Sequence, residues 1–277
     1  MHVLTIDYHA PNAADLFCRS LKETGFAVIR RHPVTPGLIS EFYQTWQQFF
    51  DSKDKFNYTY QKPSQAGYFP FRTEKAKNHR VHDLKEFYHF YLWANHPPEI
   101  NQITKQLYTE LVMLAGHLLQ WIEKGLPDSV AAKLTLPLID MITESKNTVL
   151  RILHYPPLAE SLDQDAVRAA PHEDINLITL IPAATSPGLE VKDKSGDWYE
   201  VNCDKGNIIV NVGDMLQECT DSYYQSTTHR VINPLDHLNL PRYSAPLFLH
   251  PREEVQLSNQ YTAKAYLIER LRQIGIY

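Results

Sequence analysis

Two histidines and one aspartate have the residue types and spacing of a metal site. The sequence Pro171-His-Glu-Asp174 precedes a predicted strand, and an extended backbone projects His172 and Asp174 from the same face. His229 lies in a later predicted strand, 227–232, which barrel closure would bring opposite this pair. Two imidazoles and one carboxylate form the facial triad that suits non-haem Fe(II), whereas a structural zinc site takes four ligands. Taken alone, the His-Glu-Asp sequence favours a surface turn whose aspartate starts a strand over a metal site.

A second pair of residues has the chemistry of an anion site. Arg242 and Ser244 are two residues apart and share a face of a predicted strand. A guanidinium inside a barrel needs an anion, and a carboxylate bound through two of the three guanidinium nitrogens, with a hydroxyl alongside, fits this pair. A bound dicarboxylate would satisfy it. The alternative is an arginine that pairs with a protein carboxylate at the rim of the barrel.

The elements that must position these residues are short strands in the second half of the chain. After Asn147 the apolar residues recur with the period of two that is typical of strands, and Gly, Pro, Asn and Asp separate the runs. So many short strands predict a sandwich or a barrel. The expected strands are 148–155, 175–181, 188–192, 198–201, 207–212, 227–232 and 243–249.

The first half of the chain is mainly helical in its pattern. A helix is predicted over 98–124, where leucines and isoleucines recur at helical spacing. A short strand is predicted at 26–30, and residues 57–80 are expected to form an exposed, irregular loop. We therefore expect a single domain over residues 1–277. Its expected parts are a mostly helical N-terminal extension (1–136), a jelly-roll core (147–251) and a C-terminal helix (262–275).

Composition narrows the classes of function. The chain has 277 residues, of which 43% are hydrophobic, and its net charge is −5. This acidic balance disfavours nucleic acid as a partner. The three cysteines form no CxxC pair, and no stretch resembles a secretory signal or a membrane span. We expect a soluble, cytoplasmic protein that acts on a small molecule, with no nucleic-acid or membrane partner; its oligomeric state stays open.

Several motifs together resemble the iron(II)/2-oxoglutarate-dependent dioxygenases of the isopenicillin N synthase type. The resemblance covers most of the chain. It includes the Tyr-Pro pair at Tyr155 and the hairpin sequences that begin at Gly188 and Gly196. Upstream, Gly25-Phe26 and Asp83-Leu-Lys-Glu86 are similar to the N-terminal region of that family. The other motifs that carry the resemblance are the segments 172–174, 210–219, 226–231 and 242–244.

The resemblance implies a distorted double-stranded β-helix, or jelly roll, with helices outside. It implies that His172, Asp174 and His229 ligate Fe(II). It also implies that Fe(II), 2-oxoglutarate and O₂ take part in the reaction. The residues that would hold the distal carboxylate of 2-oxoglutarate are Arg242, Ser244 and Tyr155.

The outcome of the reaction is left open by the resemblance. Hydroxylation, desaturation and cyclisation of a small metabolite are all compatible with it. So are a 2-oxoglutarate-independent Fe(II) oxidase, an ethylene-forming enzyme and a non-catalytic jelly-roll binding protein. Candidate substrate contacts are Tyr68 and Arg72 in the long loop, Asn176, and Phe248, which shares the strand face of Arg242 if alternation continues.

Overall fold

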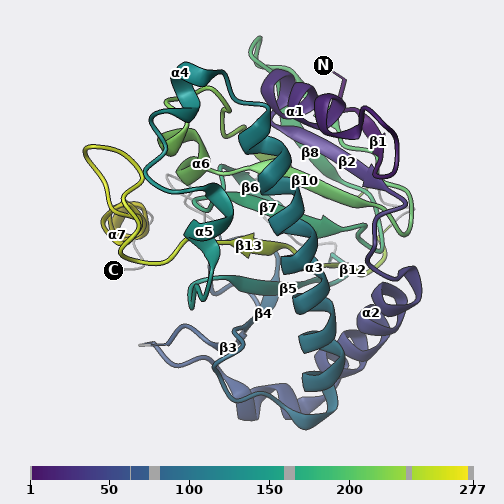
Figure 1. Ribbon diagram of the computed structural model, residues 1–277. Coiled ribbons are helices and arrows are strands. Elements are labelled where there is room, and N and C mark those ends of the chain that lie inside the picture. Colours follow the sequence, from purple (N-terminus) through teal and green to yellow (C-terminus); the bar gives the residue numbers. More distant parts are fainter. Residues whose placement is uncertain (1, 63, 75–81, 159–165, 235–238, 274–277) are drawn as a thin grey trace.

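The protein is described here from a computed structural model that covers residues 2–62, 64–74, 82–158, 166–234 and 239–273. The folded core is built from one large and one small β-sheet with helices packed on the outside of the large sheet (Figure 1). Within the described ranges, none of the helices is long and apolar enough to cross a membrane.

The large sheet contains nine strands within the described residues. Their order is β1-β2-β10-β7-β13-β5-β4-β3, and β12 pairs with β5 beside β13. Strands from the first half of the chain therefore extend the sheet on both sides of the strands from the second half. The bounds are β1 (Thr5–Asp7), β2 (Phe26–Arg30), β3 (Gly67–Phe69), β4 (Glu86–Phe90), β5 (Val149–Tyr155), β7 (Ile178–Pro182), β10 (Ile208–Val212), β12 (Arg242–Ser244) and β13 (Leu247–Leu249).

The small sheet faces the inner side of the large one. Its order is β6-β11-β8-β9, with bounds Ala169–His172, His229–Val231, Leu189–Lys192 and Trp198–Glu200. One apolar cluster joins the two sheets, because Ile181 and Ile209 from the large sheet pack in it with Val191 and Val231 from the small sheet. Two facing sheets with helices outside confirm the predicted fold class, a double-stranded β-helix with flanking helices.

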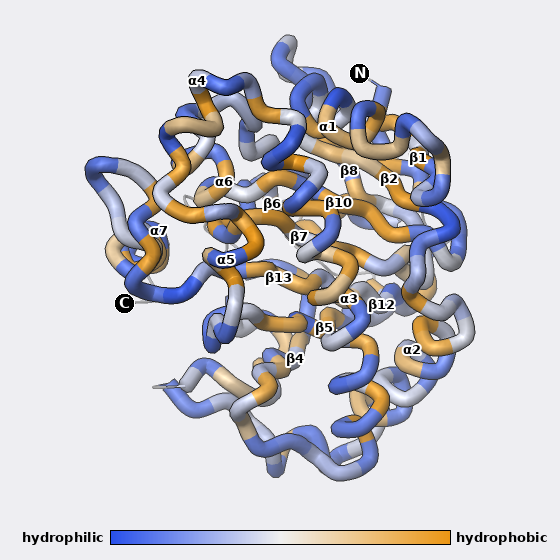
Figure 2. Tube along the Cα trace, in the orientation of Figure 1, coloured by the Kyte–Doolittle hydropathy of each residue, from blue (hydrophilic) through white to orange (hydrophobic). Residues whose placement is uncertain are grey.

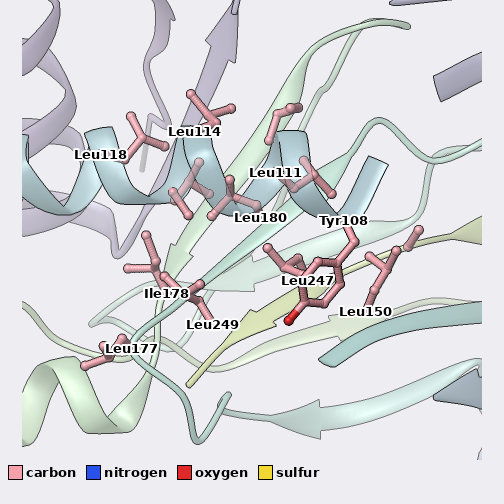
Figure 3. Packing of buried hydrophobic residues seen from close by; sticks show 14 of the residues in the cluster. Tyr108, Leu111, Leu114, Leu118, Leu150, Leu177, Ile178, Leu180, Leu247 and Leu249 are labelled. Atoms are coloured by element: carbon pink, nitrogen blue, oxygen red, sulfur yellow. The ribbon is translucent and has the colours of Figure 1, made fainter. Parts of the chain in front are cut away.

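The main hydrophobic core lies on the other face of the large sheet. Strand alternation turns Ile178 and Leu180 outward, where they meet the buried face of the long helix α3 (Pro98–Lys124; Figure 3). Figure 2 shows this apolar layer as orange segments along the strands and α3. The remaining helices are α1 (Ala13–Thr24), α2 (Pro36–Asp51), the 3-10 helix η1 (Lys53–Tyr58), α4 (Asp128–Ala131), α5 (Leu138–Ile142), α6 (Asp214–Cys219) and α7 (Ala263–Gln273).

Some elements differ from those expected. Strand β3 lies inside the segment 57–80 that was expected to be an exposed loop, and all three of its residues are buried against β4. Strand β6 was not expected, because Pro171 interrupts a run of only four residues. The division of the chain into parts at residues 136, 147, 251 and 262 stays a prediction, although strands from both halves share one sheet.

The expected strand 243–249 is divided into β12 and β13. The pairing register on β5 continues through the break, since Ser244 lies opposite Leu153 and Leu247 lies opposite Leu150. Alternate residues of these strands therefore keep facing the space between the two sheets. This space is a cavity whose lining includes Asp174, His229 and Arg242.

Candidate active site

The structure brings His172, Asp174 and His229 together at one end of the cavity. The nearest imidazole nitrogen of each histidine is Nε2, which lies 4.0 Å (His172) and 3.7 Å (His229) from Oδ1 of Asp174. All three potential ligand atoms lie within 4.8 Å of one another. An ion about 2.1 Å from each donor joins donors up to about 4.2 Å apart, so both nitrogen–oxygen separations suit a shared ion. Direct pairing across the β6–β11 ladder sets this geometry, because His229 lies opposite His172.

Both imidazole rings present the right nitrogen to an ion. Nδ1 of His172 lies 2.8 Å from the carbonyl oxygen of Ala170, and Nδ1 of His229 lies 3.0 Å from that of Thr227. A carbonyl only accepts, so Nδ1 carries the proton and donates it, which leaves the lone pair of Nε2 facing Asp174. Loss of water around the ring, together with His229, lowers the pKa of His172 and favours the neutral form that binds metals.

The carboxylate of Asp174 uses its two oxygens differently. Oδ2 accepts hydrogen bonds from Oγ1 of Thr179 at 2.6 Å and from Nδ2 of Asn211 at 2.8 Å, and Oδ1 points toward the histidines. Burial alone would raise the pKa of Asp174, but the two imidazoles and these two hydrogen bonds lower it overall. The carboxylate is therefore ionised and fixed in orientation, as a metal ligand requires.

A backbone clamp holds the turn that carries Asp174. The amide of Asp214 donates to the carbonyl of Asp174 at 2.7 Å, and the amide of Gly213 donates to that of Leu177 at 2.9 Å. A Cβ on Gly213 would lie only 2.1 Å from the carbonyl oxygen of Asn176. Glycine is needed here because any side chain would push the two turns apart.

Arg242, Ser244 and Tyr155 lie together at another part of the cavity wall. Arg242 is 4% exposed, and its Nε donates to the carbonyls of Ser186 and Pro187 at 2.9 and 3.2 Å. Its terminal nitrogens and the two hydroxyls have no hydrogen-bond partner among the residues that the structure describes. Burial lowers the pKa of Arg242, as expected for a cation without its anion. These free donors suit a carboxylate.

The four candidate substrate contacts lie in different places. Phe248 lines the cavity. Tyr68 is buried beside β4, and its hydroxyl donates to Glu86. Arg72 is exposed, and Asn176 is fully buried with its amide directed at the backbone of β7. The described lining of the cavity contains none of these last three.

The sequence analysis did not predict two charged residues of the cavity lining, Arg151 and Lys85. Arg151 could have been found from alternation on β5, since it lies four residues before Tyr155 and shares its face. Lys85 belongs to the Asp-Leu-Lys-Glu motif, but it lies just before β4, where alternation gives no orientation.

Two family models match the chain. Residues 146–251 match the model described as the 2OG-Fe(II) oxygenase superfamily. Residues 6–109 match the model described as the N-terminal region of non-haem dioxygenases in morphine synthesis.

Similar proteins agree with these matches. A crystal structure of a candidate oxygenase from Shewanella oneidensis shares 46% identity over 100% of both chains, with a TM-score of 0.91. A Caulobacter crescentus protein described as a candidate member of the 2OG-Fe(II) oxygenase family shares 29% identity over 99% of both chains, with a TM-score of 0.82. A proline hydroxylase of Petromyces alliaceus is 29% identical over 93% of this chain and 90% of its own length.

Proposed function

Because the chain belongs to the 2OG-Fe(II) oxygenase superfamily, we propose that His172, Asp174 and His229 hold its Fe(II) and that Arg242, Ser244 and Tyr155 hold the distal carboxylate of 2-oxoglutarate. The observation that carries this proposal is the convergence of the three potential ligand atoms within 4.8 Å. The protein is an Fe(II)/2-oxoglutarate-dependent dioxygenase, and its relatives do not favour the 2-oxoglutarate-independent, ethylene-forming or non-catalytic alternatives.

The residues of the chain have distinct tasks in this reaction. Bound Fe(II) supplies the redox chemistry by which O₂ oxidises 2-oxoglutarate to succinate and CO₂ while the substrate is oxidised. Ala170 and Thr227 fix the two histidine tautomers through their carbonyls, and Thr179 and Asn211 fix the carboxylate. His172, Asp174 and His229 would hold the metal from one side and would leave its other side open to the cavity.

Arg242 gives the cosubstrate its direction. The guanidinium forms a planar fork that matches a carboxylate, and its Nε is held by backbone carbonyls, so the terminal nitrogens have a fixed orientation. Binding of an anion there removes the cost of an unpaired buried cation. The opposite end of 2-oxoglutarate would then be directed to the metal.

The substrate is proposed to be a small molecule and the outcome to be hydroxylation. A proline hydroxylase among the relatives supports this choice over desaturation or cyclisation. The apolar lining residues near the site, which include Leu153, Ile181 and Phe248, would exclude water from the substrate.

Two variants test the site by separating metal binding from cosubstrate binding. Anaerobic calorimetric titration with Fe(II), and then with 2-oxoglutarate, measures the two affinities separately. His229→Ala should abolish Fe(II) binding. Arg242→Lys should retain Fe(II) but bind 2-oxoglutarate about 10- to 100-fold more weakly, because it loses a charged, forked pair of hydrogen bonds.

Exposed residues provide the controls. His9→Ala and Arg19→Lys change the same residue types on the surface and should leave both affinities unchanged. Undiminished Fe(II) binding by His229→Ala, or undiminished 2-oxoglutarate affinity in Arg242→Lys, would contradict the assignment.

A further inference from the structure

A second pair of basic residues lines the cavity, apart from Arg242. Lys85 and Arg151 both belong to the lining, whereas the carboxylates that pair with them, Glu74 and Asp83, do not. Nζ of Lys85 lies 2.8 Å from Glu74 and 2.8 Å from Asp83, and NH1 of Arg151 lies 3.3 Å from Glu74. The two basic residues of this cluster therefore belong to the cavity wall, and the carboxylates that pair with them do not.

Arg151 is held in place before any ligand arrives. Its Nε donates to Nε2 of His89 at 2.8 Å, and its guanidinium carbon lies 4.8 Å from the ring centre of Phe87 and 5.3 Å from that of Phe248. Burial lowers the pKa of His89 to about 3, so this ring is neutral and can accept the hydrogen bond. The NH2 nitrogen has no partner among the described residues. The guanidinium is therefore fixed in orientation, and its NH2 nitrogen is left unpaired among these residues.

The position of Arg151 suits a ligand other than 2-oxoglutarate. It lies four residues from Tyr155 on the same face of β5, which places their backbones about 13 Å apart along the strand. Tyr155 lies opposite Arg242 in the sheet, so the proposed cosubstrate subsite is at one end of the cavity and Arg151 at another. Phe248, which contacts Arg151, adds an apolar surface beside it.

We propose that the substrate carries a carboxylate, which the unpaired NH2 nitrogen of Arg151 binds while Phe248 contacts the apolar part. This inference rests on the proposed iron and 2-oxoglutarate site, because that site occupies Arg242. Charge-assisted hydrogen bonds to a rigid guanidinium discriminate strongly between a carboxylate and its neutral amide. Substrate selection is then a property of Arg151 and is separate from cosubstrate binding.

Matched pairs of small molecules test this selectivity. The probes are benzoate, cyclohexanecarboxylate and hexanoate, each with its amide. Each is titrated by calorimetry into anaerobic, Fe(II)-loaded protein with saturating 2-oxoglutarate, so that Arg242 is already occupied. At least one carboxylate should bind tenfold or more tightly than its amide to the unchanged protein and to the exposed control variant Arg19→Gln.

Two Arg151 variants complete the experiment. Arg151→Gln should reduce the preference for the carboxylate over its amide to less than about twofold, and Arg151→Lys should retain part of this preference. Both variants should bind 2-oxoglutarate with the affinity of the unchanged protein. Arg151→Lys keeps a positive charge beside Glu74, so this variant can be used for the test if Arg151→Gln does not fold. No carboxylate preference in the unchanged protein, or a full preference in a folded Arg151 variant, would overturn the inference. Failure of 2-oxoglutarate itself to bind would instead overturn the proposed function.

Discussion

At the scale of single residues, the neighbours of Asp174 matter as much as its own identity. Thr179 and Asn211 both bind Oδ2, so the other oxygen of the carboxylate is directed to the histidines. A carboxylate that can rotate binds a metal ion more weakly, because binding must first fix the orientation of its oxygens. Residues that contact a ligand from behind commonly affect metal affinity by 10- to 100-fold.

Thr179→Val tests this positioning role. The side chain keeps its shape but loses the hydroxyl that donates to Asp174 at 2.6 Å. We expect Fe(II) affinity to fall by about tenfold or more with little change in the far-ultraviolet circular dichroism. Thr109→Val, whose hydroxyl binds only the backbone of α3 on the surface, is the matched control. Equal Fe(II) affinity in Thr179→Val and Thr109→Val would show that Thr179 does not position Asp174 for the metal.

At the scale of elements, the site depends on two turns that touch. The turn between β6 and β7 carries Asp174, and the turn between β10 and α6 holds it through backbone hydrogen bonds from Gly213 and Asp214. The glycine in the motif 210–219 is therefore explained by the contact of Gly213 with the turn that carries Asp174. Its role is to place the ligand-bearing backbone.

Gly213→Ala should loosen this contact. The new Cβ would lie 2.1 Å from the carbonyl oxygen of Asn176, so the turns must separate. We expect the free energy of unfolding to fall by about 1–3 kcal/mol, and Fe(II) affinity to fall with it. Gly37→Ala is the control, because this exposed helical glycine has nothing within 4 Å of the added Cβ; it should be neutral or stabilising by up to about 1 kcal/mol. A stable Gly213→Ala protein with unchanged Fe(II) affinity would contradict the clamp.

The sequence was informative about elements with a regular period. The helix 98–124 and most strands of the second half follow directly from periodicity, and so does the shared face of Arg242, Ser244 and Phe248. The short strands β3 and β6 were missed because three or four residues show no period, and only pairing with distant strands stabilises them. Alternation places Arg151 on the same face of β5 as Tyr155, but it does not predict the contacts of Arg151 with His89 and Phe248.

At the scale of the whole molecule, the charged cluster behind the cavity connects separate parts of the chain. Glu74 lies after β3, Lys85 before β4 and Arg151 on β5, and ion pairs join all three. Asp83 extends the cluster to β6 by accepting a hydrogen bond from the amide of Ala170. The same buried charges therefore hold the cavity walls together.

This cluster predicts a loss of stability in acid. Burial alone would raise the pKa of Glu74, but the charges of Arg151 and Lys85 hold it well below its ordinary value of 4.5. A carboxyl whose pKa is lowered by folding stabilises the fold above the unfolded pKa, and this contribution is lost as pH falls toward the folded value. Glu74→Gln should therefore reduce the free energy of unfolding at pH 7 by about 1–3 kcal/mol.

Denaturant unfolding of both proteins between pH 7 and pH 3 checks this prediction. The difference between Glu74→Gln and the unchanged protein should narrow below about pH 4.5, whereas the exposed control Glu41→Gln should differ little at any pH. A difference that stays constant with pH would show that the charge of Glu74 is not what stabilises the fold.

The most direct measurement is a crystal structure of the protein grown anaerobically with Fe(II) and 2-oxoglutarate, with the iron located by its anomalous scattering. We predict one iron within about 2.0–2.3 Å of Nε2 of His172, Oδ1 of Asp174 and Nε2 of His229. The distal carboxylate of 2-oxoglutarate should lie on Arg242. An iron bound elsewhere, or a cosubstrate that does not contact Arg242, would contradict the account.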